Sequence, residues 1–335
     1  MIFRSVKALA VAGAMLASTT QANAATTWEY YLYTGVTHPV TLLLKEFADE
    51  VKKRTNGELV INVRAAGELP FKATEVVKIV GDGQVQLGSA SPGFIGGSTP
   101  IATVGNHVGL IRTYEDMAKA WPTIQKYADK RFKTAGAKTL FHWNWPTQQL
   151  FGTAKVKPPA SLSDFAGLKI RTVAPQEAEM LRRLSAASVA LTLPEVPVAL
   201  ERGVMDGLIS AAFNVVSTKW YEFLKWVYVS DMHIGGPNYE LVNIAAYEAL
   251  PANVRQALDK TAAEWSDKMN ATISARDAAD LQSLKDKYGL ELIQAKPEDL
   301  KKLNDVMQSY WDEWAKQQGP DGVAMMQEIR QILKR

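Results

Sequence analysis

Alternating and helical patterns of apolar residues predict strands and helices in turn along the first half of the chain. Residues 28–33 and 59–63 alternate as strands, and between them a helix over 40–55 carries Leu43, Phe47 and Val51 on one face. The next predicted elements are a helix over 73–80, a strand over 85–89, a loop over 91–97, a helix over 114–132 and a strand over 139–143. Strand, helix and strand in this order are typical of a parallel α/β layer.

A second, shorter series follows a break at Pro158-Pro159. Its predicted elements are strands over 168–172, 188–193 and 207–211, helices over 176–184 and 195–202, an extended segment over 226–230 and a strand over 241–244. Helical periodicity then covers about 252–288 and 297 to the end. We therefore expect a two-lobed α/β fold with long C-terminal helices. Lobe I would comprise 25–150 and about 236–275, and lobe II about 151–235 and 276–335.

The first 24 residues have the pattern of a secretory signal peptide. Arg4 and Lys7 precede an apolar run over 8–17, and Ala22-Asn23-Ala24 is a small-residue cleavage site. The apolar run is about half the roughly 20 residues of a membrane-spanning helix, and no later segment is apolar enough to span. We expect cleavage after Ala24, a periplasmic location and no stable membrane insertion.

Composition narrows the possible functions. The 335 residues, 47% of them hydrophobic, suffice for about two domains with real cores. Without the basic residues of the predicted signal, 36 Lys and Arg face 35 Asp and Glu, so we expect no nucleic-acid partner. The absence of cysteine excludes disulfides, thiol nucleophiles and Cys-based zinc sites.

Motifs for catalysis are missing from the sequence. The four histidines are dispersed without HExxH spacing, GxSxG does not occur, and the run GDGQVQLG fits neither phosphate-binding glycine pattern. These observations disfavour an enzyme, although a carboxylate pair of the glycosidase kind would escape such a scan. We expect no enzymatic activity, no cofactor and no resident metal.

One stretch, residues 161–222, combines features that suit a small anion. Leu168–Thr172 is an extended basic segment that places the Arg171 guanidinium at a strand end, and Met205-Asp206-Gly207 is a tight turn into the next strand. Arginine stays charged, and its planar fork matches a carboxylate bidentately. Ligands of α/β proteins bind at such strand ends, although an ion pair between the lobes would also explain Arg171. Asp206 fits a role in its own turn better than ligand contact.

Three motifs in this stretch resemble the periplasmic solute-binding subunits of TRAP transporters, the DctP-like family. LSDFAGLKIR (Leu162–Arg171) resembles the family's DLKGLKIR, and EVPVALERGVMDG (Glu195–Gly207) resembles ExYxALxxGx(I/V)DG. KWYE (Lys219–Glu222) resembles the K(F/W)YE segment that follows. Each motif is short, but their order and spacing together are specific, and weaker agreement covers nearly the whole chain after residue 24.

The resemblance implies a type II periplasmic-binding fold whose lobes close on an organic acid and pass it unaltered to a TRAP membrane permease. It places the principal ligand contact at Arg171. The second arginine of acidic-sugar binders is replaced by Gln149, with Gln148 as the alternative, and Ser210 stands where Asn or Trp is usual, with Asn214 nearby. One arginine fewer favours a monocarboxylate such as a 2-oxo, 2-hydroxy or aromatic acid.

Further candidates rest on weaker grounds. Some relatives bridge a 2-oxo acid through a cation held by Gln and Glu; Gln149 and Glu240 would fill those positions, but the matching Trp is missing. The aromatic candidates for the ligand site, which could equally be ordinary core, are Tyr33, Phe94, Trp145 and Phe213. His38 and Ser91, on first-lobe loops, are candidate hydrogen-bond partners. An exported enzyme acting on an organic acid and a ligand-sensing module for a membrane receptor remain alternative functions.

Overall fold

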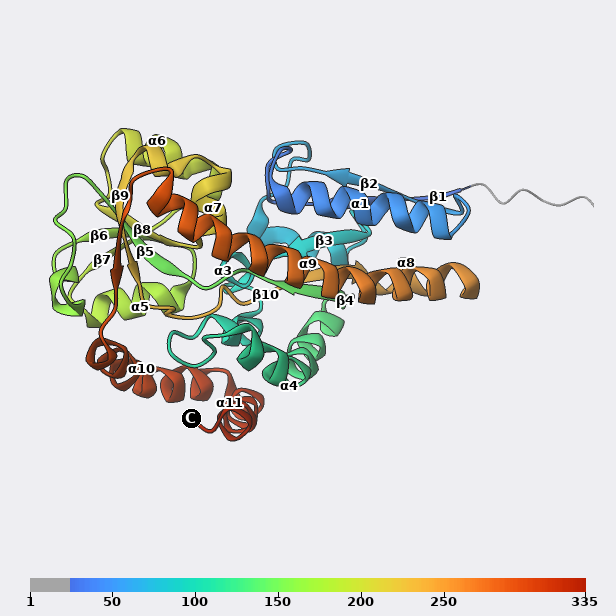
Figure 1. The fold of residues 1–335 in the computed structure, drawn as a ribbon. Coiled ribbons are helices and arrows are strands. Elements are labelled where there is room, and N and C mark those ends of the chain that lie inside the picture. Colours follow the sequence, from blue (N-terminus) through green and yellow to red (C-terminus); the bar gives the residue numbers. More distant parts are fainter. Residues whose placement is uncertain (1–24) are drawn as a thin grey trace, which may run out of the picture.

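The computed structural model describes residues 25–335, and its strands form two sheets that build two neighbouring lobes (Figure 1). The predicted signal peptide lies outside the described residues. The prediction of a two-lobed α/β fold with long C-terminal helices is confirmed. Lobe I denotes the part built on the first sheet and lobe II the part built on the second.

The sheet of lobe I has the order β2-β1-β3-β10-β4. Its strands are β1 (Thr26–Tyr31), β2 (Leu59–Arg64), β3 (Leu87–Ala90), β4 (Ala137–Asn144) and β10 (Pro237–Asn243). β1 runs parallel to β2 and β3, whereas β10 is antiparallel to both of its neighbours. The helices of this lobe are α1 (Pro39–Arg54), α2 (Val76–Gly81), α3 (Pro92–Ile95), α4 (Tyr114–Thr134) and α8 (Ile244–Glu248). On α1 the fully buried leucine is Leu44, with the predicted Leu43 only half-buried.

The sheet of lobe II has the order β11-β9-β5-β8-β6-β7. Its strands are β5 (Gln149–Thr153), β6 (Lys169–Thr172), β7 (Ala187–Ala190), β8 (Gly207–Ser210), β9 (Leu224–Val229) and β11 (Glu291–Gln294). β6 is parallel to β7 and β8, and β5 is antiparallel to β8 and β9. Its helices are α5 (Pro175–Arg183), α6 (Val196–Glu201) and α7 (Ala212–Ser217). The Asp206 carboxylate accepts a hydrogen bond from Lys169 N (2.8 Å), which ties the turn before β8 to β6.

Two chain segments cross between the lobes side by side. Residues 145–148 lead from β4 to β5, and residues 230–236 lead back from β9 to β10. Thr147 pairs with Ile234, and Gln148 N donates to His233 O (2.8 Å), so the two crossings form one strap.

Helix α9 (Ala252–Asp286) spans both lobes, as Figure 1 shows. In its first half Trp265 Nε1 donates to Leu43 O of lobe I (3.0 Å). In its second half the Asp277 carboxylate accepts from Phe213 N of lobe II (2.7 Å). This single helix therefore contacts the structural elements of both lobes.

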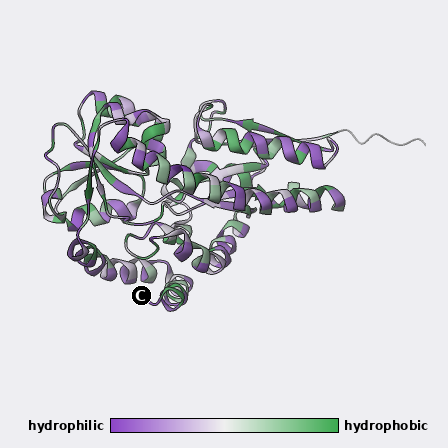
Figure 2. Cartoon of the chain, viewed as in Figure 1, coloured by the Kyte–Doolittle hydropathy of each residue, from purple (hydrophilic) through white to green (hydrophobic). Residues whose placement is uncertain are grey.

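The C-terminal helices α10 (Pro297–Gln317) and α11 (Gly319–Leu333) also touch both lobes. On α10, Val306 O accepts from Arg183 of α5 (3.0 Å), while α11 forms the ion pair Asp321–Lys130 with α4 (2.6 Å). The sequence predicted uninterrupted helical structure here, but Gly319 takes a φ of +72° and separates two helices. Figure 2 shows hydrophilic and hydrophobic residues alternating along α10, the pattern of a helix with one buried face.

Several short elements were absent from the prediction: α3, a 3-10 helix at Pro100–Asn106, β5, α7, α8 and β11. Each has seven residues or fewer, too few for periodicity to identify the element. Strand β5 is also buried at every position, so its sequence does not alternate. The predicted strand over 241–244 begins earlier, at Pro237, and Ile244 starts α8. The residue boundaries predicted for the two lobes stay a prediction.

Candidate functional site

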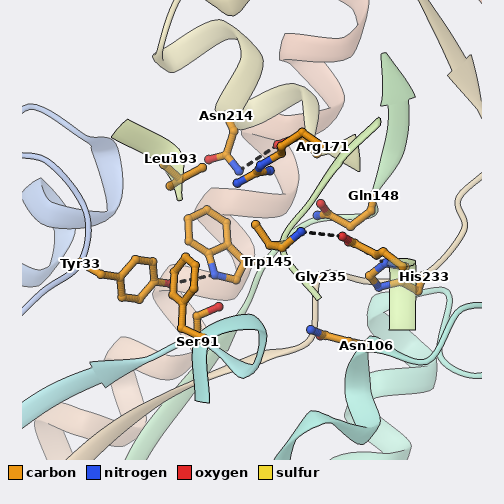
Figure 3. Close-up of a pocket in the computed structure, with 14 residues that line it drawn as sticks. Tyr33, Ser91, Asn106, Trp145, Gln148, Arg171, Leu193, Asn214, His233 and Gly235 are labelled. Atoms are coloured by element: carbon orange, nitrogen blue, oxygen red, sulfur yellow. Dashed lines mark hydrogen bonds and ion pairs between the residues drawn. The ribbon is translucent and has the colours of Figure 1, made fainter. Parts of the chain in front are cut away.

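A cavity lies between the lobes beyond the ends of β1, β3, β6 and β8 (Figure 3). This is the place where α/β proteins with open sheets usually hold their ligands. It contains about 450 Å³ of empty space, part of it open to solvent. Its lining residues are Tyr33, Ser91, Phe94, Asn106, Trp145, Gln148, Arg171, Val173, Glu177, Leu193, Ser210, Asn214, His233 and Gly235.

Arg171 presents an incompletely bonded guanidinium to this cavity. Its side chain is 1% exposed; Nε donates to Leu191 O (3.0 Å) and Nη1 to Ile209 O (3.1 Å). Nη2 is buried and has no hydrogen-bond partner among the described residues. Since Nη1 keeps a second N–H, the Nη1–Nη2 edge remains available for a carboxylate.

Burial also affects the charge state of Arg171. It lowers the pKa of the guanidinium to about 10, while the nearby Glu177 and Glu195 carboxylates raise that pKa. Arg171 therefore remains positive at neutral pH. An unpaired charge in such a place is costly, and an anionic ligand would relieve that cost.

Asn214 and Ser210 adjoin Arg171 on the lobe II side of the cavity. Asn214 Nδ2 donates to Ser210 Oγ (3.3 Å), and Asn214 Oδ1 lies 3.3 Å from His38 Nε2. His38 Nδ1 accepts from Val40 N (3.3 Å), so the proton of the neutral ring is on Nε2 and is donated to Asn214. Burial lowers the pKa of His38 to about 4, which keeps the ring neutral. His38 thus lies behind the lining and orients Asn214 across the lobe interface.

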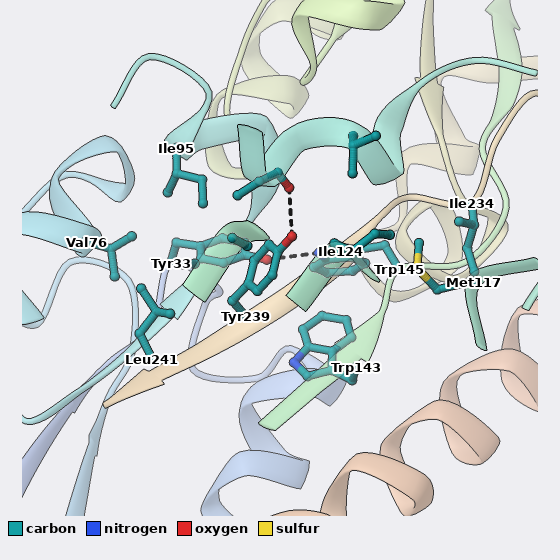
Figure 4. Close-up of a cluster of buried hydrophobic side chains, with 14 of the residues drawn as sticks. Tyr33, Val76, Ile95, Met117, Ile124, Trp143, Trp145, Ile234, Tyr239 and Leu241 are labelled. Atoms are coloured by element: carbon teal, nitrogen blue, oxygen red, sulfur yellow. Dashed lines mark hydrogen bonds between the residues drawn. The ribbon is translucent and has the colours of Figure 1, made fainter. Parts of the chain in front are cut away.

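Three predicted aromatic residues form the opposite wall: Tyr33, Phe94 and Trp145. The Tyr33 and Phe94 rings meet edge to face at 5.1 Å, and Trp145 Nε1 donates to the Tyr33 hydroxyl (3.0 Å). Figure 4 shows Tyr33 and Trp145 continuing into the buried cluster with Trp143 and Tyr239. Phe213 does not line the cavity; its ring packs behind the lining, 5.6 Å from His38 and 6.3 Å from Trp145.

Gln149 and Glu240 also lie outside the lining, which Gln148 joins instead. Gln149 Oε1 accepts from Ser230 N (2.8 Å) and Asp231 N (2.9 Å), so this amide braces the strap between the lobes. Among residues 25–335, no cluster of three or more His, Cys, Asp or Glu could hold a metal ion. The bridging cation stays a prediction.

Glu240 is fully buried behind the aromatic wall, on β10. Its carboxylate accepts four hydrogen bonds, from Tyr30 (2.6 Å), Ser89 (3.0 Å), Trp143 (2.5 Å) and Asn238 (2.8 Å). Burial raises the pKa of Glu240 to about 7, against the effect of these donors.

The model of one protein family matches residues 32–318: the bacterial extracellular solute-binding proteins of family 7, DctP. The chain belongs to this family. Family 7 consists of substrate-binding receptors rather than enzymes, and its members include receptors of TRAP transporters, so the predicted resemblance is confirmed. Within the described residues, no helix has the length and apolar character required to cross a membrane.

Individual relatives are distant but cover most of this family 7 chain. It is 27% identical over 286 residues to the C4-dicarboxylate-binding periplasmic protein DctP of Rhodobacter capsulatus, covering 83% of each chain. It resembles the crystal structure of DctP7, a Bordetella pertussis extracytoplasmic solute receptor binding pyroglutamic acid, with a TM-score of 0.84 and 25% identity over 91% of this chain and all of that one. An uncharacterized protein of Sinorhizobium fredii, y4mM, is 28% identical over 246 residues; the match covers 67% of this chain but only 44% of that longer protein.

Six lining residues of this family 7 chain were not predicted: Asn106, Val173, Glu177, Leu193, His233 and Gly235. Val173 and Glu177 follow Arg171 by two and six residues, so extending the strand-end argument past β6 would have found them. His233 and Gly235 lie on the strap, which has no sequence signal of its own. Ser91, by contrast, was predicted and lines the cavity at the end of β3.

Proposed function

We propose that this protein is a periplasmic receptor that captures a small monocarboxylate between its lobes and delivers it to a TRAP-type membrane permease. The observation that carries the proposal is the buried Nη2 of Arg171, which has no partner within residues 25–335 and borders the cavity. A carboxylate is the anion whose two oxygens match the free Nη1–Nη2 edge.

Two further observations support one carboxylate on a compact acid. In the described part of the chain no second Arg and no Lys lines the cavity, so a second carboxylate would lack a guanidinium or ammonium partner of its own. The cavity holds about 450 Å³ of empty space, part of it open to solvent, which suits a compact acid or one that the lobes open to admit. Pyroglutamate, which the similar DctP7 receptor binds, meets both conditions and is the first acid to test.

What supports delivery to a permease is the family, whose members include receptors of TRAP transporters. Solute-binding receptors of TRAP transporters release their ligand to membrane subunits when the lobes reopen. The predicted signal peptide would export the receptor to the periplasm, where it would meet those subunits.

The proposal is tested first by identifying the acid that the protein carries and then by measuring how tightly it binds. Mass spectrometry of freshly purified protein should detect a co-purifying monocarboxylate, which denaturation and refolding should remove. Calorimetry on the stripped protein should then show its tightest binding to a monocarboxylate, drawn from pyroglutamate and from 2-oxo, 2-hydroxy and aromatic acids. The acid should be recovered unchanged after long incubation. A protein that binds a neutral sugar or a cation most tightly, or that converts the acid, would refute the proposal.

A further inference from the structure

A buried carboxylate and a buried imidazole share the cavity with Arg171. Glu177 lies in the first turn of α5, and His233 lies on the strap between the lobes. Each side chain is 1% exposed, and His233 Nε2 lies 3.2 Å from Glu177 Oε1. Figure 3 shows His233 beside Gln148 and Gly235 on the side of the cavity away from Tyr33.

The hydrogen bonds of Glu177 suit an ionised carboxylate. Oε2 accepts from Val173 N (2.9 Å) and Ala174 N (3.3 Å), the amides at the end of β6 and the start of α5. Oε1 faces the imidazole of His233. Two backbone amides therefore donate to one carboxylate oxygen, and the imidazole faces the other.

The partners of His233 suit a ring with two protons. Nδ1 lies 2.6 Å from Ile234 O, and because a carbonyl oxygen only accepts, Nδ1 is the donor there. Nε2 faces the Glu177 carboxylate, so both ring nitrogens point at acceptors. An imidazolium satisfies both contacts, whereas a neutral ring with its proton on Nδ1 would turn a lone pair toward a carboxylate.

The charges that border the cavity then add up to one net positive. Arg171 and the His233 imidazolium are positive, and Glu177 is negative. One ligand carboxylate neutralises the set. A second carboxylate would add an unpaired negative charge in an enclosed space that already contains the Glu177 carboxylate, and such a charge is costly to bury.

We infer that Glu177, oriented by His233, is a specificity-determining residue that excludes acids with a second carboxylate. The inference rests on the proposed function and adds to it: the missing second arginine removes an attraction, whereas Glu177 supplies a repulsion. Discrimination between similar ligands commonly combines both elements. The ligand class that follows is a monoanion whose remaining polar groups are neutral.

The experiment compares matched acids on the stripped protein by calorimetry. The monocarboxylates are pyroglutamate and lactate, and the dicarboxylates are glutarate and malate. Glu177→Gln should narrow the preference for monocarboxylates by about tenfold or more, because like charges in contact cost several kcal/mol. His233→Gln should widen that preference, because it removes a positive charge and leaves Glu177 in place. Glu179→Gln, on the same helix with its carboxylate paired to Arg182 and Arg183, should leave the preference unchanged.

The opposite signs expected for Glu177→Gln and His233→Gln separate charge selectivity from a loss of structure, because misfolding would weaken binding of every acid. Glu177→Gln retains a side-chain oxygen for the amides of Val173 and Ala174, so the melting temperature of this variant should stay near that of the wild type. An unchanged preference in both variants would overturn the inference and leave the proposed function standing. A wild-type protein that prefers the dicarboxylates, or binds neither set, would overturn both.

Discussion

The two walls of the cavity are built in different ways. On the lobe II wall Arg171 is fixed by backbone carbonyls of the chain around β7 and β8, Leu191 O and Ile209 O. On the lobe I wall Tyr33 and Trp145 are fixed by other side chains: Trp145 donates to Tyr33, and Tyr33 donates to Asn238 (2.5 Å). A group held by main-chain carbonyls depends on the course of the backbone, whereas a wall held by side-chain contacts depends on which residues occupy it. Under the proposed function, Arg171 of the lobe II wall would bind the ligand carboxylate, and the aromatic side chains of the lobe I wall would contact the rest of the ligand.

A carboxylate stands behind each wall: Glu240, which is fully buried, and Asp277, which is half-buried. Glu240 accepts a hydrogen bond from Asn238, so the hydrogen-bonded side chains of the aromatic wall continue into the core. Asp277 of α9 accepts from Phe213 N at the start of α7, the helix that carries Asn214. Burial raises the pKa of each to about 7. Both walls therefore share one kind of support, although their surfaces differ.

The largest effect should come from Arg171→Gln, which removes the charge of the lobe II wall. We expect ligand affinity to fall by roughly 1,000-fold, or about 4 kcal/mol, since breaking a buried charge pair costs about 3–5 kcal/mol. Arg171→Lys should lose about 100-fold, because lysine keeps the charge and lacks the fork. Calorimetry with the identified acid measures both losses.

The matched control is Arg182→Gln, an exposed arginine on α5 that pairs with Glu179. The affinity of Arg182→Gln for the identified acid should equal that of the wild type. If Arg171→Gln binds within tenfold of this control, Arg171 is a structural ion-pair residue and the lobe II wall does not select for charge.

The next largest effect, on stability, should come from replacing the Glu240 and Asp277 carboxylates. Their folded pKa values lie above those of the unfolded chain, so between about pH 4 and 7 the folded state binds more protons. Each carboxylate therefore lowers the free energy of unfolding as the pH rises through this range, by on the order of 2–3 kcal/mol. Glu240→Gln and Asp277→Asn should each remove their share of this fall, as urea unfolding at pH 5 and 7.5 would measure.

Three histidines, two of them buried and His142 half-buried, act in the opposite direction. Burial lowers the pKa of His38 to about 4 and those of His107 and His142 to about 3, so these groups raise the free energy of unfolding as the pH rises. The pH dependence of each variant's unfolding free energy is therefore compared with that of the wild type, which itself varies with pH. A variant whose unfolding free energy changes with pH as the wild type's does would show that its carboxylate does not titrate in this range.

The residues that line the cavity differ in how far the sequence predicts them. Arg171, Ser210 and Tyr33 lie at or near the C-terminal ends of predicted strands, and Phe94 lies in the predicted loop that follows another. Strand ends follow from local alternation. Glu177 and His233 meet across 56 residues of sequence, through a strap that has no periodicity. Such a contact depends on how the lobes are joined, which local pattern does not encode.

The same limit explains the candidates that do not line the cavity. Phe213 and His38 lie close in sequence to residues that do, but their side chains point behind the wall and pack on each other. Glu240 alternates correctly along β10, and its direction places it in the core beneath Trp143 and Tyr30. Sequence locates the strand and the loop; the packing of the two lobes decides which side chains reach the space between them.

The smallest of these effects should come from the place where the walls meet. Gly93, on α3 of lobe I, lies so close to lobe II that a Cβ there would be 2.8 Å from Val173 O. Since that oxygen belongs to the backbone, Gly93→Ala must hold the lobes slightly apart. We expect affinity to fall by about tenfold, or 1.4 kcal/mol, and ligand-induced compaction in small-angle scattering to diminish.

Gly97→Ala is the matched control, because a Cβ at Gly97 would meet nothing within 4 Å. It lies in the same segment of lobe I and should leave both affinity and compaction unchanged. If Gly93→Ala binds and compacts as this control does, the approach of α3 to Val173 is not needed for ligand capture. If Gly93→Ala alone loses affinity and compaction, the lobe I wall and the lobe II wall must close fully on each other before Arg171 retains its ligand.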